Sequence, residues 1–280
     1  MNTMNKKITK TAITLATLMV ASESMAATVF SDDFNDGNRN GWYLLNATGF
    51  NSLPVETVGG ESVMSLRDTD TATDFYGAVT TFAAQDLSVV GSKITLTFDF
   101  YNDTRWPSGR QLSAGLYNSN GSVVTGDTTA AGLGWGATAN DSGMLATAQR
   151  FTDRFELRES DGQGLGELLT RLQDRTNNSA YGEDGLWFDY TLEIENIGGD
   201  LQTTATWSGS DIAGQESVSQ TWLTDAGDVN NYTFDEIGLT ARGSVNTSFD
   251  NVEVIYVVPE PSSAALLGLG GLALLLRRRK

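Results

Sequence analysis

The sequence predicts an all-β protein whose body is a single antiparallel β-sandwich, and three observations support this. Short segments that alternate apolar and polar residues fill much of the chain between residues 28 and 257. A period of two is typical of strands that have one face in water. Turn signals rich in Gly, Asn and Asp separate these segments. Proline occurs only at positions 54 and 107 of this region, so no linker divides it and we expect one domain.

Three segments show the alternation most clearly and define the core that we expect. Their inward-facing residues are Ile94, Leu96, Phe98 and Phe100, then Trp187, Tyr190, Leu192 and Ile194, and finally Phe249, Val252, Val254 and Tyr256. The second set slips out of phase near Phe188, where we expect a bulge, and the third set shifts phase at Asp250–Asn251. Trp207 and Trp222 also lie within strand patterns and are predicted to be core residues.

One segment departs from the strand pattern. Its leucines recur at i, i+3, i+4 and i+7, which is the spacing of one face of a helix; they are Leu165, Leu168, Leu169 and Leu172. The segment therefore predicts a short helix that caps one end of the sandwich.

The N-terminus has the layout of a secretory signal peptide over residues 1–26, with a helical apolar part. A basic stretch, MNTMNKKITK, precedes an apolar run, TAITLATLMVA, and then small residues. Ser24 and Ala26 suit the positions before a signal peptidase cut, so we place cleavage after Ala26, with Ala27 as the alternative. A retained membrane anchor is the weaker interpretation, because the apolar run is short and the polar SES follows it.

The C-terminal residues 258–280, VPEPSSAALLGLGGLALLLRRRK, combine a Pro-Glu-Pro turn, an apolar run over 264–276 and a basic end. At about 1.5 Å per residue, a helix over this run is a short transmembrane span, because the hydrocarbon layer is about 30 Å thick. The basic residues act as a stop-transfer signal that stays in the cytoplasm; they are Arg277, Arg278, Arg279 and Lys280. The body would therefore lie outside the inner membrane.

This tail resembles the PEP-CTERM sorting signal of Gram-negative bacteria. The resemblance rests on the order of the three parts and on the residues Val258, Pro259, Glu260, Pro261 and Ser262. It implies recognition by an exosortase and cleavage near the two prolines, in a bacterium that makes an exopolysaccharide matrix. We expect export through the inner membrane, transient anchoring, and a final place at the cell surface or in the extracellular matrix. An ordinary tail anchor is the other interpretation.

The body resembles the concanavalin A-like or jelly-roll sandwiches of exported bacterial proteins. The resemblance rests on three stretches: DDFNDGNRNGW, WFDYTLEIEN and FDEIGLTARGSVNTSFDNVEV. It implies that the first and last strands pair and that the FDNV strand closes the sheet.

Composition excludes several classes of function. The chain has no Cys and no His, which removes disulfides, thiolates, imidazole metal ligands and Ser-His-Asp triads. The formal net charge is −17, and seven of the 18 basic residues lie in the two ends. Such an acidic body argues against nucleic acid as a partner.

A candidate calcium loop lies near the start of the body. Asp36-x-Asn38-x-Asn40-Gly41 matches the first half of a calcium loop of the EF-hand type, but Ala47 stands where the bidentate Glu should be. If the end strands pair, Asp250 could complete the site. The candidate ligands are Asp32, Asp33, Asp36, Asn38, Asn40 and Asp250. A calcium ion bound here would be structural, and we expect no required cofactor. The alternative is a turn whose side chains bind their own backbone.

Glycan binding is the activity for which the sequence offers candidates, because sugars are held by aromatic side chains with polar neighbours. Trp106 lies in a polar segment with Tyr101, Arg105 and Arg110 nearby, and Trp135 lies between glycines. We therefore expect a non-enzymatic, exported surface or matrix protein that binds exopolysaccharide or another glycan. One alternative is a glycan-active hydrolase or lyase with paired carboxylates, although no Glu-x-Asp-x-x-Glu motif is present. The other is a purely structural matrix protein.

Overall fold

A computed structural model describes eleven ranges of the chain. They are residues 24–46, 51–68, 75–102, 110–129, 141–149, 154–161, 167–173, 185–209, 217–224, 232–243 and 246–259. The predicted signal helix and transmembrane helix lie outside them. Within these ranges the structure has no helix long and apolar enough to span a membrane.

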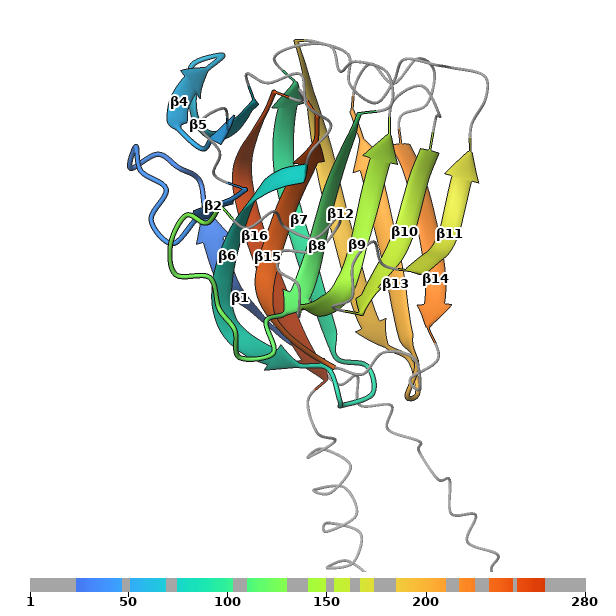
Figure 1. Cartoon of the computed structure of the whole chain (residues 1–280). Helices are drawn as coiled ribbons and strands as arrows, with labels where there is room; N and C mark the ends of the chain where they lie inside the picture. The colour runs from blue at the N-terminus through green and yellow to red at the C-terminus, as the bar shows by residue number, and fades with distance from the viewer. Residues whose placement is uncertain are drawn as a thin grey trace, which may run out of the picture. The chain divides into compact units, whose positions relative to one another are not determined.

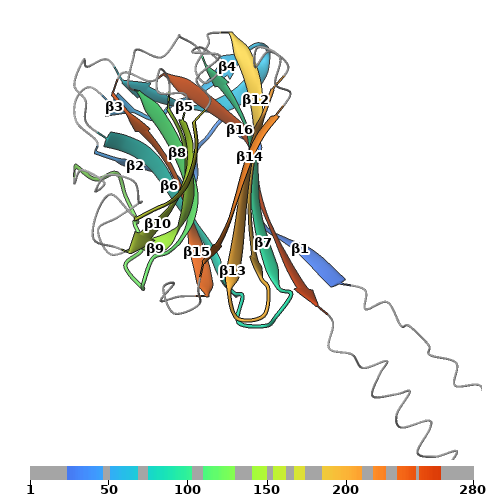
Figure 2. The ribbon, with the colours of Figure 1, turned by 90° about the vertical axis from the view of Figure 1, so that its right-hand side faces the viewer.

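The body consists of two β-sheets packed face to face, and the prediction of an antiparallel β-sandwich is confirmed (Figure 2). It forms one compact unit over Met25–Pro259. Nine strands make the first sheet, in the order β14-β13-β12-β7-β16-β5-β3, with β1 beside β16 and β4 beside β5. Seven strands make the second, in the order β11-β10-β9-β8-β15-β6-β2 (Figure 1).

The strand bounds follow the alternating segments of the sequence. The nine-stranded sheet contains β1 (Ser24–Asp32), β3 (Asn51–Ser52), β4 (Val55–Val58), β5 (Glu61–Asp68), β7 (Lys93–Asn102), β12 (Leu186–Asn196), β13 (Leu201–Ser208), β14 (Ser217–Thr224) and β16 (Thr247–Pro259). The seven-stranded sheet contains β2 (Tyr43–Leu45), β6 (Phe75–Asp86), β8 (Gln111–Asn118), β9 (Ser142–Gln149), β10 (Arg154–Asp161), β11 (Glu167–Gln173) and β15 (Thr233–Arg242).

The core between the sheets is rich in aromatic rings. Trp207 of β13 is 1% exposed, as predicted, and its ring centroid lies 4.2 Å from that of Phe100 in its own sheet and 6.5 Å from that of Phe155 in the other. The hydroxyl of Tyr190 donates a hydrogen bond of 3.0 Å to the carbonyl of Ala114 across the sandwich. These contacts join the two layers. Trp222, however, is 38% exposed on the edge strand β14, so its prediction as a core residue was wrong.

The phase of β12 also differs from the prediction. Phe188 is buried, and β12 pairs with β7 without any shift of register, so the predicted bulge is absent there. Trp187 therefore lies on the outer face. The phase shift expected in β16 is confirmed and takes the form of a bulge, because the register shifts between Asp250 and Glu253 and Asn251 has a positive φ of 50°.

The predicted helix near residue 165 is wrong for the residues described, because Glu167–Gln173 form the edge strand β11. This strand pairs with β10 along its length, with one irregularity at Leu157/Arg158. A helix of this length is marginal on its own in water. The backbone hydrogen bonds offered by β10 therefore outweigh the helical spacing of the leucines.

The first and last strands pair, as the sequence led us to expect. The hydroxyl of Thr28 in β1 donates a hydrogen bond of 2.8 Å to the carboxylate of Glu253 in β16. The last strand continues to Pro259, so the sandwich contains the first two residues of the sorting motif. The rest of that motif lies outside the described residues.

Candidate functional site

Two aromatic side chains lie side by side on the outer face of the nine-stranded sheet. Phe100 points into the core, so its neighbour Tyr101 must point outward near the end of β7. Trp187 of β12 is its partner in the register, and the two ring centroids are 5.2 Å apart with the planes at 47°. Both side chains are half-buried. We call Tyr101 and Trp187 the aromatic pair.

The sequence prediction included Tyr101 and missed Trp187. Four alternate residues of β12 are buried: Phe188, Tyr190, Leu192 and Ile194. Trp187 is out of phase with them and shares its face with Asp189 and Thr191. The signal was thus present in the alternation, and the slip assumed near Phe188 concealed it.

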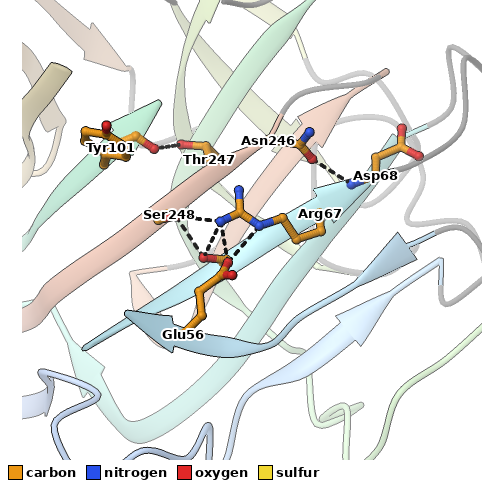
Figure 3. Close-up of polar contacts among 8 residues, drawn as sticks. Glu56, Arg67, Asp68, Tyr101, Asn246, Thr247 and Ser248 are labelled. Atoms are coloured by element: carbon orange, nitrogen blue, oxygen red, sulfur yellow. Dashed lines mark hydrogen bonds and ion pairs between the residues drawn. The ribbon is translucent and has the colours of Figure 1, made fainter. Parts of the chain in front are cut away.

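The same row continues across the sheet as hydroxyl groups. Ser248 of β16 lies opposite Tyr101, and Ser65 of β5 lies opposite Ser248. Their hydroxyl oxygens are 2.8 Å apart and both side chains are fully buried. Arg67 lies beside them and donates to the Ser65 hydroxyl at 3.2 Å. Figure 3 shows Arg67 beside Ser248 and Glu56, and its Nε donates to Glu56 at 2.7 Å. The row therefore changes from aromatic rings to hydroxyls to an ion pair.

Three carboxylates form a second row beside the first. Asp189 of β12 lies opposite Asp99 of β7, which lies opposite Asp250 of β16. We call these three residues the acidic row. Asn251, at the bulge, donates a hydrogen bond of 2.8 Å to Asp99. The bulge thus supplies one donor to a row that otherwise contains like charges in direct opposition, which is unfavourable.

Two carboxyl groups of the acidic row, those of Asp189 and Asp250, have raised pKa values. Partial burial raises the pKa of Asp189, and the charge of Asp99 and a hydrogen bond to it raise it further. Partial burial also raises the pKa of Asp250, with a smaller effect from Asp99. A hydrogen-bond donor placed among carboxylates that repel one another stabilises their charged forms. A hydroxyl-rich ligand lying on the aromatic pair would offer such donors through its O–H groups. Aromatic faces beside a few polar groups are typical of ligand sites.

Within the described ranges, the structure brings none of the other candidate glycan residues to this face. Arg110 precedes β8 of the other sheet and lies against Gly243, whose Cβ, if present, would be 2.2 Å from the Arg110 Nε. Arg105, Trp106 and Trp135 lie outside the described residues.

The candidate calcium ligands fall into two places. Asp32, Asp33 and Asp36 line a hollow of about 450 Å³ that also borders Asn251 and Glu253 at the bulge of β16. Asp250 lies close enough for Asp33 to raise its pKa slightly. Asn38 and Asn40 instead line a separate hollow of about 660 Å³ that reaches to Asp127.

The backbone of this loop already uses its side chains. Asp32 accepts hydrogen bonds of 3.0 Å from the Phe34 N–H and from the Trp42 indole N–H. Asp33 accepts from the Asn35 N–H at 3.1 Å, and Asp36 accepts from the Asn38 N–H at 3.0 Å. These are the contacts that the turn interpretation predicts. Across the described ranges, no group of three or more acidic side chains is arranged to hold a metal ion.

A buried acidic pair lies elsewhere, and sequence reasoning did not find it. Glu236 of β15 and Asp141, which precedes β9, are both fully buried. Among the described residues, no N–H or O–H donor reaches either carboxyl oxygen of Glu236. Burial first, and then the charge of Asp141 and a hydrogen bond to it, raise the pKa of Glu236 to about 10. Glu236 is therefore protonated at neutral pH. The surrounding strand pattern gave no sign of this, because burial at this position depends on tertiary contacts.

Comparison with known proteins identifies the tail and the fold. Residues 257–280 match the family model of the PEP-CTERM protein-sorting motif. Among curated proteins, none matches the sequence.

Several solved structures are similar to the body. Lectin I from Ulex europaeus, solved in complex with the methyl glycoside of alpha-L-fucose, has a TM-score of 0.54 at 11% identity, covering 84% of this chain and 98% of that one. The Lotus tetragonolobus seed lectin has a TM-score of 0.53 at 11% identity, with 85% and 100% coverage. The CBM2 module of the evolved Dit of Lactobacillus casei BL23 phage J-1 has a TM-score of 0.52 at 13% identity, with 84% and 97% coverage.

These matches establish the architecture of the chain, and at such low identity the lectins show the fold alone. The PEP-CTERM motif indicates exosortase-dependent export and membrane-anchored sorting. The chain therefore joins a sandwich with the concanavalin A-like fold of the legume lectins to a PEP-CTERM sorting motif.

Proposed function

We propose that the protein is a non-enzymatic glycan-binding component of the cell surface or extracellular matrix, delivered there by exosortase sorting. The observation that carries the proposal is the aromatic pair on the outer face of the nine-stranded sheet, beside the acidic row. Sugars present C–H faces that pack on aromatic rings, and their hydroxyls donate to carboxylates. The lectin-like fold supports the proposal without deciding it.

The geometry of the acidic row favours binding over hydrolysis. Glycosidases that use two carboxyl groups hold them about 5–9 Å apart, which leaves room for a nucleophile or a water. Asp99 and Asp189 instead face each other directly on paired strands, and the charge of Asp99 contributes to the raised pKa of Asp189. This direct opposition supports a role in holding ligand hydroxyls. A hydrolase, a lyase and a purely structural matrix protein remain the alternatives that the binding experiment addresses.

We expect the purified full chain to bind on an array of bacterial polysaccharides that includes the matrix of the producing organism. Trp187→Ala should weaken that binding at least about tenfold, because truncating a central aromatic contact commonly costs more than about 2 kcal/mol. Trp222→Ala is the matched control, since it removes an exposed Trp from β14, away from the aromatic pair. Absence of binding to every polysaccharide, or equal loss in both variants, would contradict the proposal. Release of sugar fragments would favour the hydrolase or lyase.

We also propose a structural calcium ion at the hollow between Asp32, Asp33 and Asp36 and the bulge of β16. Calcium accepts carboxylate, amide and carbonyl oxygens in flexible geometry, so the loop could supply mixed ligands. Calcium should then raise the melting temperature and EGTA should lower it again, by differential scanning fluorimetry. Asp36→Asn should reduce the shift. An unchanged melting temperature, with no metal in the purified protein, would remove this part of the proposal.

A further inference from the structure

The end of the sandwich at which β16 terminates carries exposed aliphatic side chains. Val89 and Val90, in the turn between β6 and β7, are 50% and 59% exposed, and Ile197, in the turn between β12 and β13, is 41% exposed. We call Val89, Val90 and Ile197 the apolar end. Single exposed aliphatic residues are ordinary on a protein surface, but a group at one place calls for a partner.

Backbone hydrogen bonds hold the two turns together. The Gly91 N–H donates to the carbonyl of Asn196 at 2.7 Å, and the Asn196 N–H donates to the carbonyl of Ser92 at 3.0 Å. The side-chain amide of Asn196 also donates to the carbonyl of Leu87 at 2.7 Å. Figures 1 and 2 both show these turns at the end of the sandwich where β16 finishes. The apolar end is therefore a fixed part of the fold.

The sorting tail leaves the body at this same place. Val257 of β16 is paired with Lys93, and the ring of Pro259 lies against Gly91, where an added Cβ would be 3.0 Å from the proline Cγ. The first proline of the sorting motif thus lies beside the turn that carries Val89 and Val90.

The length of the following chain sets how far this end can lie from the membrane. Only residues 260–263 separate Pro259 from the apolar run that starts at residue 264. Five Cα–Cα steps span at most about 17 Å when fully extended. The headgroup layer itself takes up about 5–8 Å on each side of the hydrocarbon core. With the apolar run in the membrane before cleavage, Pro259, which lies beside the apolar end, is therefore held within about 9–12 Å of the membrane surface.

We propose that the apolar end rests on the lipid surface while the sorting tail is still attached. The partner is the headgroup and upper acyl region of the outer leaflet, into which Val89, Val90 and Ile197 insert. The tether supplies a high effective concentration, so a small apolar area suffices. Lys93, at the start of β7 beside these turns, is paired with Glu193 at 2.9 Å, so its charge is already compensated within the protein. The contact is therefore apolar and insensitive to salt.

The absence of Cys from the chain allows a direct test with single introduced cysteines. The full chain is reconstituted by its tail into phosphatidylcholine–phosphatidylethanolamine vesicles, with a nitrobenzoxadiazole label at Val90→Cys or at the control Ser52→Cys. Ser52 is exposed and pairs with Arg67, near the start of β16, at the other end of the sheet. Quenching by lipids that carry a spin label near the headgroup reports contact with the membrane.

We expect quenching at Val90 to exceed that at Ser52 by at least about twofold, because interfacial apolar residues lie about 5–10 Å deep. Adding Val89→Asp and Ile197→Asp to the Val90→Cys chain should reduce quenching to the Ser52 level, with an unchanged melting temperature. Equal quenching at Val90 and Ser52 would overturn the proposal. Quenching that persists after the aspartate substitutions would mean that the tether alone brings the end close. A signal that appears only when exosortase is added would identify a protein as the partner instead.

Discussion

Replacing Trp207 by alanine is expected to lower the free energy of unfolding by about 3–5 kcal/mol, the usual cost of truncating a buried Trp. The ring is 1% exposed and contacts aromatic rings of both sheets, among them Phe100 and Phe155. Its removal leaves a cavity at the place where the two layers meet. This is a large share of the stability of a single domain, about 5–15 kcal/mol, and the melting temperature should fall by about 6–20 °C.

Trp222→Ala provides the matched control for this experiment. It removes the same side chain from the edge strand β14, where the ring is 38% exposed. A substitution at such a site should change the free energy of unfolding far less, by about 1 kcal/mol or below. Urea unfolding followed by circular dichroism measures both variants. Comparable losses in the two would mean that Trp207 does not join the sheets as described.

Glu236→Gln is expected to remove a pH dependence from the stability of the sandwich. The pKa of Glu236 is about 10 in the folded state, against 4.5 for an unperturbed Glu. Between these values the unfolded chain has lost the proton and the folded chain retains it, so the free energy of unfolding falls as pH rises. Between pH 5 and pH 8 this loss amounts to at most about 4 kcal/mol. Glutamine is neutral throughout and keeps a donor for Asp141.

The variant should therefore be more stable than the natural protein at pH 8, and the difference should shrink towards pH 5. Melting temperatures across this range, with Glu195→Gln on the outer face of β12 as the control, give the comparison. If the natural protein and Glu236→Gln lose stability in parallel as pH rises, Glu236 is not the buried protonated group. Destabilisation of the variant at every pH would lead to the same conclusion.

Much of the fold could be predicted from the sequence, because alternation reports directly on which face of a strand is buried. Ile94 to Phe100 and the bulge at Asp250–Asn251 follow from that rule. The strand β11 could not be predicted in this way, because an edge strand gains its hydrogen bonds from a neighbour that sequence spacing does not reveal. Local periodicity there indicated a helix, and the pairing with β10 decided otherwise.

The candidate site was predictable only in part. Tyr101 was included because it lies near Trp106 in the sequence, whereas its pairing with Trp187 depends on the register between β7 and β12. The acidic row also depends on strand register, since Asp99, Asp189 and Asp250 are far apart in the sequence and meet only through strand pairing. Glu236 shows most clearly what sequence spacing does not predict. Burial of a single carboxyl group depends on everything packed around it, and no spacing rule contains that information.

The central position of the last strand has a consequence for when the body can fold. β16 lies between β7 and β5, inside the nine-stranded sheet, and it contributes Phe249, Val252 and Val254 to the core. The sheet has a gap in its middle until those residues arrive, and in the sequence β16 follows every other strand of the sandwich. Strand pairings so distant in sequence also form slowly. The sandwich therefore cannot close before residues 247–259 are available to pair with β7 and β5.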